Sequence, residues 1–137
     1  MPLTYTGQEE PLKKLLKFFD KDTVGFNKFA RQELLTKLNQ LKKGNKSLWN
    51  ITYGGNFTVL KNSNPDAVLT FTRQKDENKV LCLFNFSEKE QSFKMNDEIS
   101  GNFNNYLGEK ITLNKENNYK LKPCGYSVLV SNLFLTT

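Results

Sequence analysis

Apolar side chains recur at helical spacing through residues 27–43. They stand three or four positions apart, at Ala30, Leu34, Leu38 and Leu41. This is the spacing of one face of an amphipathic α-helix, whereas the residues between them are mostly polar or basic. The pattern predicts a helix over residues 27–43, with Asn27 as its N-cap and Gly44 in the left-handed position that ends it.

Beyond Asn50 the pattern changes to short apolar runs separated by Asn, Asp, Gly and Lys. Runs of this length with turn residues between them are typical of antiparallel strands. We expect eight strands, at residues 57–60, 67–73, 79–86, 91–95, 102–107, 110–113, 118–121 and 126–131. The sequence therefore predicts a mainly β fold, an antiparallel Greek-key β-sandwich of about eight strands preceded by one amphipathic α-helix.

One expected strand differs from the others in its hydrophobic pattern. Residues 80–86, Val-Leu-Cys-Leu-Phe-Asn-Phe, are almost continuously apolar and do not alternate with polar residues. A strand of this kind is usually covered on both faces. We therefore expect residues 80–86 to lie centrally in a sheet.

Several short motifs follow one another along the chain in an order that a known family shares. The first is an apolar-Pro-apolar-x-Tyr-x-Gly-Gln-Glu run made by Pro2, Leu3, Tyr5, Gly7, Gln8 and Glu9. The family also has an Asn-Pro-Ala-Leu turn. The corresponding residues here are Asn45-Lys46-Ser47-Leu48, which differ from that turn at Lys46 and Ser47. Further landmarks are Phe18-Phe19-Asp20, Gly54-Gly55-Asn56-Phe57, Phe71-Thr72-Arg73, residues 80–87 and Gly125-Tyr126. In these motifs the chain resembles the α-amylase family of retaining glycoside hydrolases.

The resemblance implies a division of the chain and a role for each part. Residues 1–46 would be a remnant of the catalytic barrel, comprising its final strand, a loop and its final helix, and residues 47–137 would be the C-terminal β-sandwich. On this interpretation the chain begins within the fold of a larger enzyme. Tyr5, Gln8 and Glu9 would then come from the rim of the barrel, near the sugar pocket.

The resemblance also implies that no catalytic residue lies in this chain. Family enzymes cleave α-glucosidic bonds with two carboxylates, which lie on earlier barrel strands, and they hold the sugar with histidines, of which this chain has none. The acidic pairs of the chain, such as Asp76-Glu77 and Asp97-Glu98, stand in polar turn-like contexts where carboxylates are usually solvated. We expect a non-catalytic, stabilising portion of an enzyme that acts on α-glucans, inactive by itself.

Metal and cofactor chemistry find little support in the sequence. The chain has no histidine, no Cys-x-x-Cys and no calcium loop of alternating acids. Gly54-Gly55 lacks the flanking residues of a phosphate-binding loop, so we expect no metal and no cofactor. Cys82 and Cys124, on distant strand-like segments, are expected to be free thiols.

A second hypothesis concerns the aromatic residues beside the glycine pair. Trp49 and Tyr53 are candidates for binding sugar, because sugar rings stack on exposed aromatic side chains. The favoured interpretation of Trp49 is that it packs the end of the helix onto the sandwich, as a single Trp commonly does at such a junction. The alternative function is therefore a stand-alone carbohydrate-binding module with Trp49 and Tyr53 as its platform.

Composition limits the partners of the chain. Its 137 residues carry a net charge of +6, which would suit a nucleic acid as partner. The lysines, however, are mixed with acidic residues along the whole length, and the two arginines, Arg31 and Arg73, are far apart, so no basic stripe forms. No long apolar span or signal peptide is evident, so the compartment stays open and we expect neither nucleic acid nor membrane as a partner. The expected partners are the catalytic barrel, an α-glucan and, through apolar surface left uncovered, a second copy of the chain.

Overall fold

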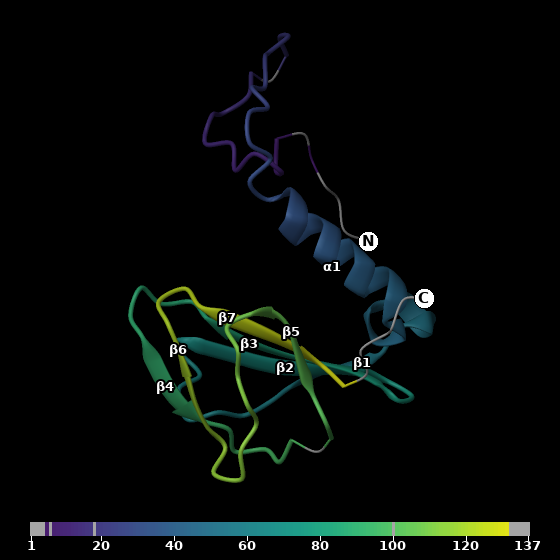
Figure 1. Ribbon diagram of the computed structural model, residues 1–137, viewed down its shortest axis with the longest axis vertical. Coiled ribbons are helices and arrows are strands. Elements are labelled where there is room, and N and C mark those ends of the chain that lie inside the picture. Colours follow the sequence, from purple (N-terminus) through teal and green to yellow (C-terminus); the bar gives the residue numbers. More distant parts are fainter. Residues whose placement is uncertain (1–4, 6, 18, 100, 132–137) are drawn as a thin grey trace. The chain divides into compact units, whose positions relative to one another are not determined.

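A computed structural model of the chain describes residues 5, 7–17, 19–99 and 101–131. It divides into two compact units, Met1–Lys43 and Gly44–Thr137. The second unit carries the β-sheets (Figure 1). None of the helices in the described ranges is long and apolar enough to cross a bilayer.

The helix α1 spans Gln32–Gly44 and so begins five residues after the predicted N-cap. Asn27 does not cap it, because the backbone N–H groups of Asn27, Lys28 and Phe29 donate to the Glu10 carboxylate instead. Phe29 also has a φ of +48°, which a right-handed helix does not accommodate. A tertiary contact with a residue far back in the sequence therefore delays the start of the helix.

The end of α1 also differs from the expectation. Gly44 is its last residue and is not among the glycines with positive φ. The chain leaves the helix through Asn45, which is extended (φ −104°, ψ 111°) and whose side chain accepts from the Ser47 N–H. Asn45 thus caps the next element, the 3-10 helix η1 (Lys46–Leu48), and removes the need for a left-handed glycine.

The expected barrel strand at the start of the chain is absent from the described part of that segment. Residues 7–11 form turns, and Tyr5 and Gln8 are joined by two hydrogen bonds, from Gln8 N to Tyr5 O (3.1 Å) and from Tyr5 N to the Gln8 amide oxygen (2.9 Å). An isolated strand has no neighbour for its backbone donors and acceptors, whereas a turn satisfies them locally. Pro2, Leu3 and Phe18 lie outside the described residues.

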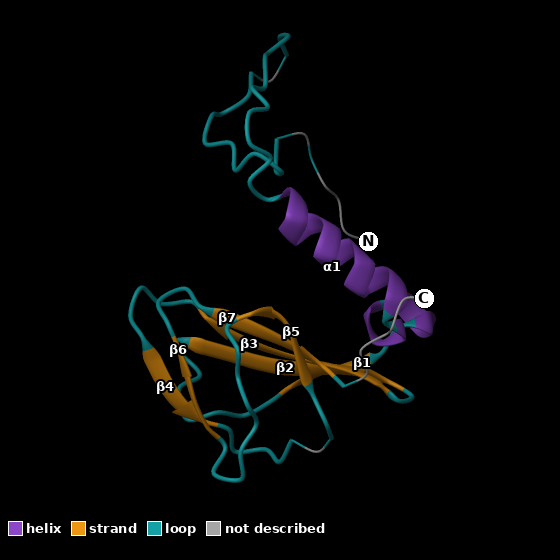
Figure 2. Ribbon diagram, viewed as in Figure 1, coloured by secondary structure: helices purple, strands orange, loops and turns teal. Residues whose placement is uncertain are grey.

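The second unit is an antiparallel β-sandwich, as predicted, with seven strands in the described residues (Figure 2). The larger sheet has the order β1-β2-β3-β7-β5 and the smaller one pairs β4 with β6. The strands are β1 (Asn56–Val59), β2 (Val68–Lys75), β3 (Asn78–Asn85), β4 (Gln91–Lys94), β5 (Asn104–Gly108), β6 (Asn118–Leu121) and β7 (Tyr126–Val130).

The eighth expected strand, at residues 110–113, does not form. The Asn105 side chain takes the place of a pairing strand there, since its amide oxygen accepts from Ile111 N and its amide nitrogen donates to Ile111 O, both at 3.0 Å. These bonds satisfy the backbone of Ile111, whose side chain still enters the core. Alternating apolar residues alone could not distinguish this loop from a strand.

The core lies between the two sheets. Leu81 and Leu83 of β3 and Leu129 of β7 meet Phe93 of β4 and Leu121 of β6 in one buried cluster. The alternate residues of β3 point away from this cluster, and two of them, Val80 and Cys82, are also buried. The expectation that β3 is covered on both faces is therefore confirmed over this part of the strand.

Candidate functional site

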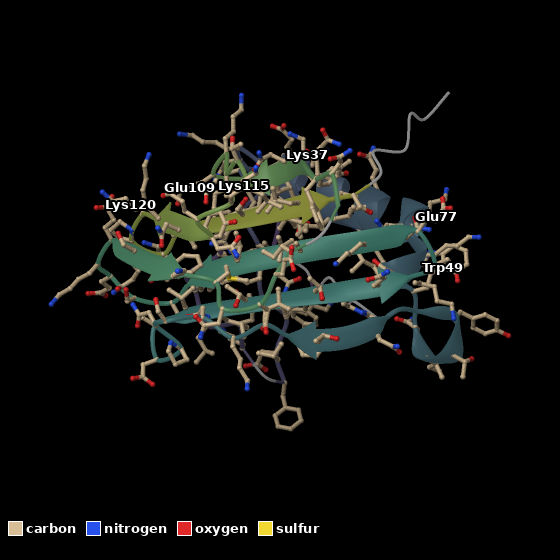
Figure 3. All side chains as sticks on the ribbon, turned by 90° about the horizontal axis from the view of Figure 1, so that it is seen from below. Lys37, Trp49, Glu77, Glu109, Lys115 and Lys120 are labelled. Atoms are coloured by element: carbon tan, nitrogen blue, oxygen red, sulfur yellow. The ribbon has the colours of Figure 1, made fainter. Side chains whose placement is uncertain are left out.

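The two residues considered for sugar binding lie on one short loop of the second unit. Trp49 follows η1, and Tyr53 ends a second 3-10 helix, η2 (Ile51–Tyr53). Trp49 is 38% exposed and Tyr53 75% exposed. Figure 3 shows Trp49 near the same end of the larger sheet as Glu77. Both aromatic side chains are accessible, and Ile51 between them is more exposed still, at 89%.

Two cations from β2 fix this loop in place. The Arg73 guanidinium donates from Nη2 to the carbonyls of Trp49 (3.2 Å) and Gly55 (3.1 Å). The Lys75 ammonium donates to the carbonyl of Thr52 at 3.3 Å. Bonds from charged donors are stronger than neutral ones, so the loop is held at three of its carbonyls. A loop anchored in this way loses little further freedom when something binds to it.

Close contacts with other backbone atoms explain why two glycines, Gly54 and Gly55, stand next to each other in this loop. A Cβ on Gly54 would stand 1.9 Å from the Trp49 carbonyl oxygen, and one on Gly55 would stand 2.5 Å from that of Gln74. Neither glycine has a positive φ. Glycine is therefore needed here because another part of the backbone comes too close for a side chain, and not because of an unusual backbone torsion. The pair lets the loop lie directly against β2.

Ile51 adds backbone strain to the same loop. Its φ is +53°, in the left-handed region that β-branched residues rarely enter. Such strain persists only where the surroundings impose it, and it occurs often at sites of recognition. Here the bonds from Arg73 and Lys75 to the loop provide that constraint.

A row of aromatic rings runs across the outward face of the larger sheet, the face turned away from the core. We call it the aromatic row; its members are Phe57, Phe71, Phe84, Phe86 and Tyr126. Successive ring centroids are separated by 4.9 Å (Phe57 to Phe71) and 6.0 Å (Phe71 to Phe84). Phe84 then lies 5.9 Å from Phe86 and 6.2 Å from Tyr126. The row links β1, β2, β3 and β7.

Sequence reasoning missed the aromatic row, although a signal for it was present. In β2 the buried positions Val68, Thr70 and Thr72 alternate with Leu69 and Phe71, so both faces of this strand carry apolar groups. All five rings come from strands that the sequence predicts. Only the pairing register, in which Phe71 stands opposite Cys82 and Phe84 opposite Tyr126, places them on one surface.

The outward face of the smaller sheet is polar by contrast. Ser92 and Lys94 of β4 and Asn118 and Lys120 of β6 are exposed there, and Lys120 pairs with Glu90 at 2.7 Å. A surface hollow of about 410 Å³ opens beside these residues, and a second one of about 360 Å³ lies near Val59 and Asn96. Neither hollow is lined by a carboxylate, so neither offers the acid pair of glycoside hydrolysis.

The predicted rim residues belong to the other unit and are described apart from the sandwich. Tyr5 is 63% exposed and is joined to Gln8 within a turn. The Glu9 side chain is partly buried, and its Oε2 has no hydrogen-bond partner. The neighbouring Glu10 accepts hydrogen bonds from the backbone ahead of α1. The bond from the Phe29 N–H, with those from Lys28 and Asn27, lowers the pKa of Glu10, and desolvation acts in the opposite direction.

The ionisable groups do not assemble into a metal site in the part of the chain that the structure describes. Cys82 and Cys124 are free thiols, as the sequence predicts. Burial raises the pKa of the Cys82 thiol to about 12, so this group stays protonated near neutrality and is a poor nucleophile.

Solved structures with the same fold come from carbohydrate-active enzymes. A noncanonic maltogenic α-amylase, AmyB from Thermotoga neapolitana, matches with a TM-score of 0.62 and 18% identity over 94% of this chain and 30% of its own. Trehalose-6-phosphate hydrolase from Bacillus licheniformis matches with a TM-score of 0.54 and 20% identity over 69% of this chain and 17% of its own. An isomaltulose synthase mutant from Erwinia rhapontici gives a TM-score of 0.51 and 20% identity over 77% and 18%.

The chain thus spans less than a third of the length of these structures, and at such identities they establish the fold alone. Comparison with curated proteins gives no match. The sequence model of one family, described as the maltogenic amylase C-terminal domain, matches residues 57–127, just over half of the chain. This chain, whose matched residues run from β1 into β7, therefore belongs to the maltogenic amylase C-terminal domain family, a C-terminal domain of α-amylase family glycoside hydrolases.

Proposed function

We propose that this chain is a non-catalytic C-terminal portion of an α-amylase-like glycoside hydrolase acting on α-glucans, and that it stabilises the enzyme's catalytic barrel. The observation that carries the proposal is the family match over residues 57–127. It is supported by the lengths of the matched enzymes, of which this fold makes up 17 to 30%. In that arrangement the other part of the enzyme supplies the chemistry.

The proposal includes a division of the chain into residues 1–46, taken from the barrel, and residues 47–137, the sandwich. It treats Tyr5, Gln8 and Glu9 as supports of the barrel rim. The partner is the barrel itself, and the sandwich stabilises it by burying apolar area, at roughly 25 cal/mol per Å². The sandwich thereby fixes loops near the sugar pocket that it does not itself enter.

The first test is enzymatic. The purified chain is incubated with maltooligosaccharides and starch, and released reducing ends are measured. We expect no turnover, because no described hollow presents a pair of carboxylates. Turnover that disappears on substitution of an acidic residue of this chain would refute the non-catalytic role.

The second test addresses stabilisation. In the parent enzyme, removal of residues 47–137 should lower the temperature at which the barrel unfolds and speed its thermal inactivation. Calorimetry with and without these residues measures the effect. A barrel that is equally stable without them would contradict the proposal.

A second candidate function, binding of α-glucan by the sandwich alone, is favoured by the loop that carries Trp49 and Tyr53. The loop is anchored by Arg73 and Lys75 and exposes both aromatic side chains. Titration with maltoheptaose, followed by tryptophan fluorescence, tests it. Saturable binding that Trp49→Ala abolishes, with an unchanged circular dichroism spectrum, would favour this function, whereas no change at millimolar sugar would remove it.

A further inference from the structure

The exposed apolar surface of the sandwich unit is concentrated in one region. Among the described residues of this unit, the large apolar side chains that are exposed are Trp49, Ile51, Tyr53, Phe57, Val59 and Phe86. Each belongs either to the anchored loop or to the outward face of the larger sheet. Scattered exposed apolar residues are ordinary, whereas a contiguous patch marks a surface that meets another molecule or domain.

The charged groups beside this patch are already engaged. On β2 the outward side chains at the loop end are Arg73 and Lys75, and both donate to loop carbonyls. The register places Cys82 opposite Phe71 and Tyr126 opposite Phe84, and the charged side chain next to them on this face, Arg73, stands opposite Phe57 and is bonded to the loop. The middle of the face is therefore suited to an uncharged, apolar partner.

This composition favours a protein surface over a sugar as the occupant of the aromatic row. A glucan bound to aromatic rings also needs several hydrogen-bond partners for its hydroxyl groups. In the row itself Tyr126 has a hydroxyl group, whereas the neighbouring Leu69, Cys82 and Val128 offer no strong partner. The rings are also packed on one another, with interplanar angles of 21° between Phe71 and Phe84 and 26° between Phe84 and Phe86. Such a row presents a continuous apolar ridge rather than separate stacking platforms.

The path of the chain indicates which protein surface lies against the aromatic row. The 3-10 helix η1 is where the polypeptide enters the sandwich unit, and it packs against β2 and β3. Arg73, an outward-facing residue of β2, bonds the carbonyl of Trp49 directly after η1, so this entry lies on the outward side of the larger sheet. Elements that follow one another in sequence usually lie next to one another in space.

We propose that the aromatic row is the surface on which the sandwich docks against the catalytic barrel of its enzyme, with Phe57 and Phe86 at its two exposed edges. The proposal rests on the proposed function, which supplies the barrel, and it adds the residues that form the contact. The smaller sheet, whose outward side chains are polar, then faces solvent.

The test uses two matched double variants of the parent enzyme. Phe57→Ser with Phe86→Ser alters the aromatic row, and Lys94→Ser with Lys120→Ser alters the polar face of the smaller sheet. All four side chains are exposed, so neither pair disturbs the core. Calorimetry and initial rates on maltooligosaccharides at low temperature are measured for each.

We expect the aromatic-row variant to lower the unfolding temperature of the barrel by roughly 5 °C or to separate barrel and sandwich unfolding into two transitions. The lysine variant should stay within about 1 °C of the unaltered enzyme. The same substitutions in the 137-residue chain should leave its own unfolding temperature unchanged, which excludes a folding defect. An unchanged barrel transition in the aromatic-row variant would overturn the docking surface.

The failures of the two proposals can be told apart. If removal of residues 47–137 destabilises the barrel but the aromatic-row substitutions do not, the sandwich supports the barrel through another surface and only the present inference fails. If removal has no effect either, the proposed function fails as well. If the 137-residue chain is a dimer by light scattering, and the aromatic-row variant is a monomer with an unaltered barrel transition, the row binds a second copy and the inference is wrong.

Discussion

The two outward faces of the sandwich differ in chemistry although they cover the same core. On the smaller sheet, Lys94 and Lys120 point outward and the inward residues Phe93 and Leu121 are buried, which is the simple alternation of a sheet with one wet face. On the larger sheet both faces are apolar, with the core on one side and the aromatic row on the other. A strand needs only one apolar face to fold. On the second face of the larger sheet Val80 and Cys82 are already buried, and the exposed part, around Phe57 and Phe86, is available for a contact outside the sandwich.

The anchored loop extends this comparison. Its carbonyls are bonded by Arg73 and Lys75, so the charges of the larger sheet are used internally. Lys120 on the smaller sheet is paired with Glu90 at the exposed surface. The cationic side chains of the larger sheet therefore bond the anchored loop, whereas Lys120 of the smaller sheet lies at the exposed surface. Substitutions can test each sheet separately.

The largest effect is expected from the core that both sheets share. Leu81 is fully buried between the sheets, so Leu81→Ala removes packed methyl groups and leaves a cavity. We expect a loss of about 2–5 kcal/mol in the free energy of unfolding, measured by urea denaturation. A loss below about 1 kcal/mol would mean that the sheets close around the vacancy and that the core is loosely packed.

Gly55→Ala tests the attachment of the loop to β2. The added Cβ would lie 2.5 Å from the carbonyl oxygen and 2.6 Å from the carbonyl carbon of Gln74. Because backbone cannot move aside as a flexible side chain can, we expect a loss of about 1–3 kcal/mol. Gly25→Ala is the matched control, since the nearest atom to its added Cβ is 3.7 Å away. Equal stability of the two variants would show that the loop is not held against the strand.

Ile51→Gly tests the strain in the same loop. Glycine adopts the φ of +53° without steric conflict, and the exposed isoleucine side chain contributes little burial. Relief of strain outweighs the greater flexibility of glycine in the unfolded chain, so we expect a gain of about 1 kcal/mol. Thr52→Gly, next to it, lacks a positive φ and should be neutral or destabilising. Destabilisation by Ile51→Gly, measured by thermal unfolding, would argue against strain.

The smallest effect on stability is expected from substitutions on the two outward faces, and these compare the faces most directly. Phe86→Ser and Lys120→Ser each change an exposed side chain, and we expect both to stay within about 0.5 kcal/mol of the unaltered chain. Self-association and binding of the dye ANS should fall for Phe86→Ser and stay unchanged for Lys120→Ser. If both variants bind the dye equally, the aromatic row does not form an accessible apolar surface.

Sequence patterns located most elements of the second unit because each depends on neighbouring residues. The runs at residues 67–73, 91–95 and 118–121 carry enough apolar character to be recognised as strands, and β2, β4 and β6 lie there. Elements controlled by a specific side-chain contact, which the hydrophobic pattern does not show, could not be found in this way. Glu10 delays the start of α1, and Asn105 replaces the strand expected at residues 110–113.

The candidate site shows the same division. The glycine pair and the aromatic residues Trp49 and Tyr53 were visible in the sequence, and the structure places them on one exposed loop. Their anchoring through Arg73 was not visible, because Arg73 is 24 positions away from Trp49 in the chain. A partner for the loop, whether sugar or protein, stays a proposal.

By itself the sequence determined the class of the fold, the family resemblance and the continuously apolar central strand, since these follow from local pattern and from motifs in order. Only the tertiary structure decided which apolar residues share a face. A strand shows its alternation in sequence, but the register between strands brings Phe57, Phe71 and Phe84 together from separate segments. Register depends on the packing of the whole sandwich, and for this reason the aromatic row emerged only when the strands were paired.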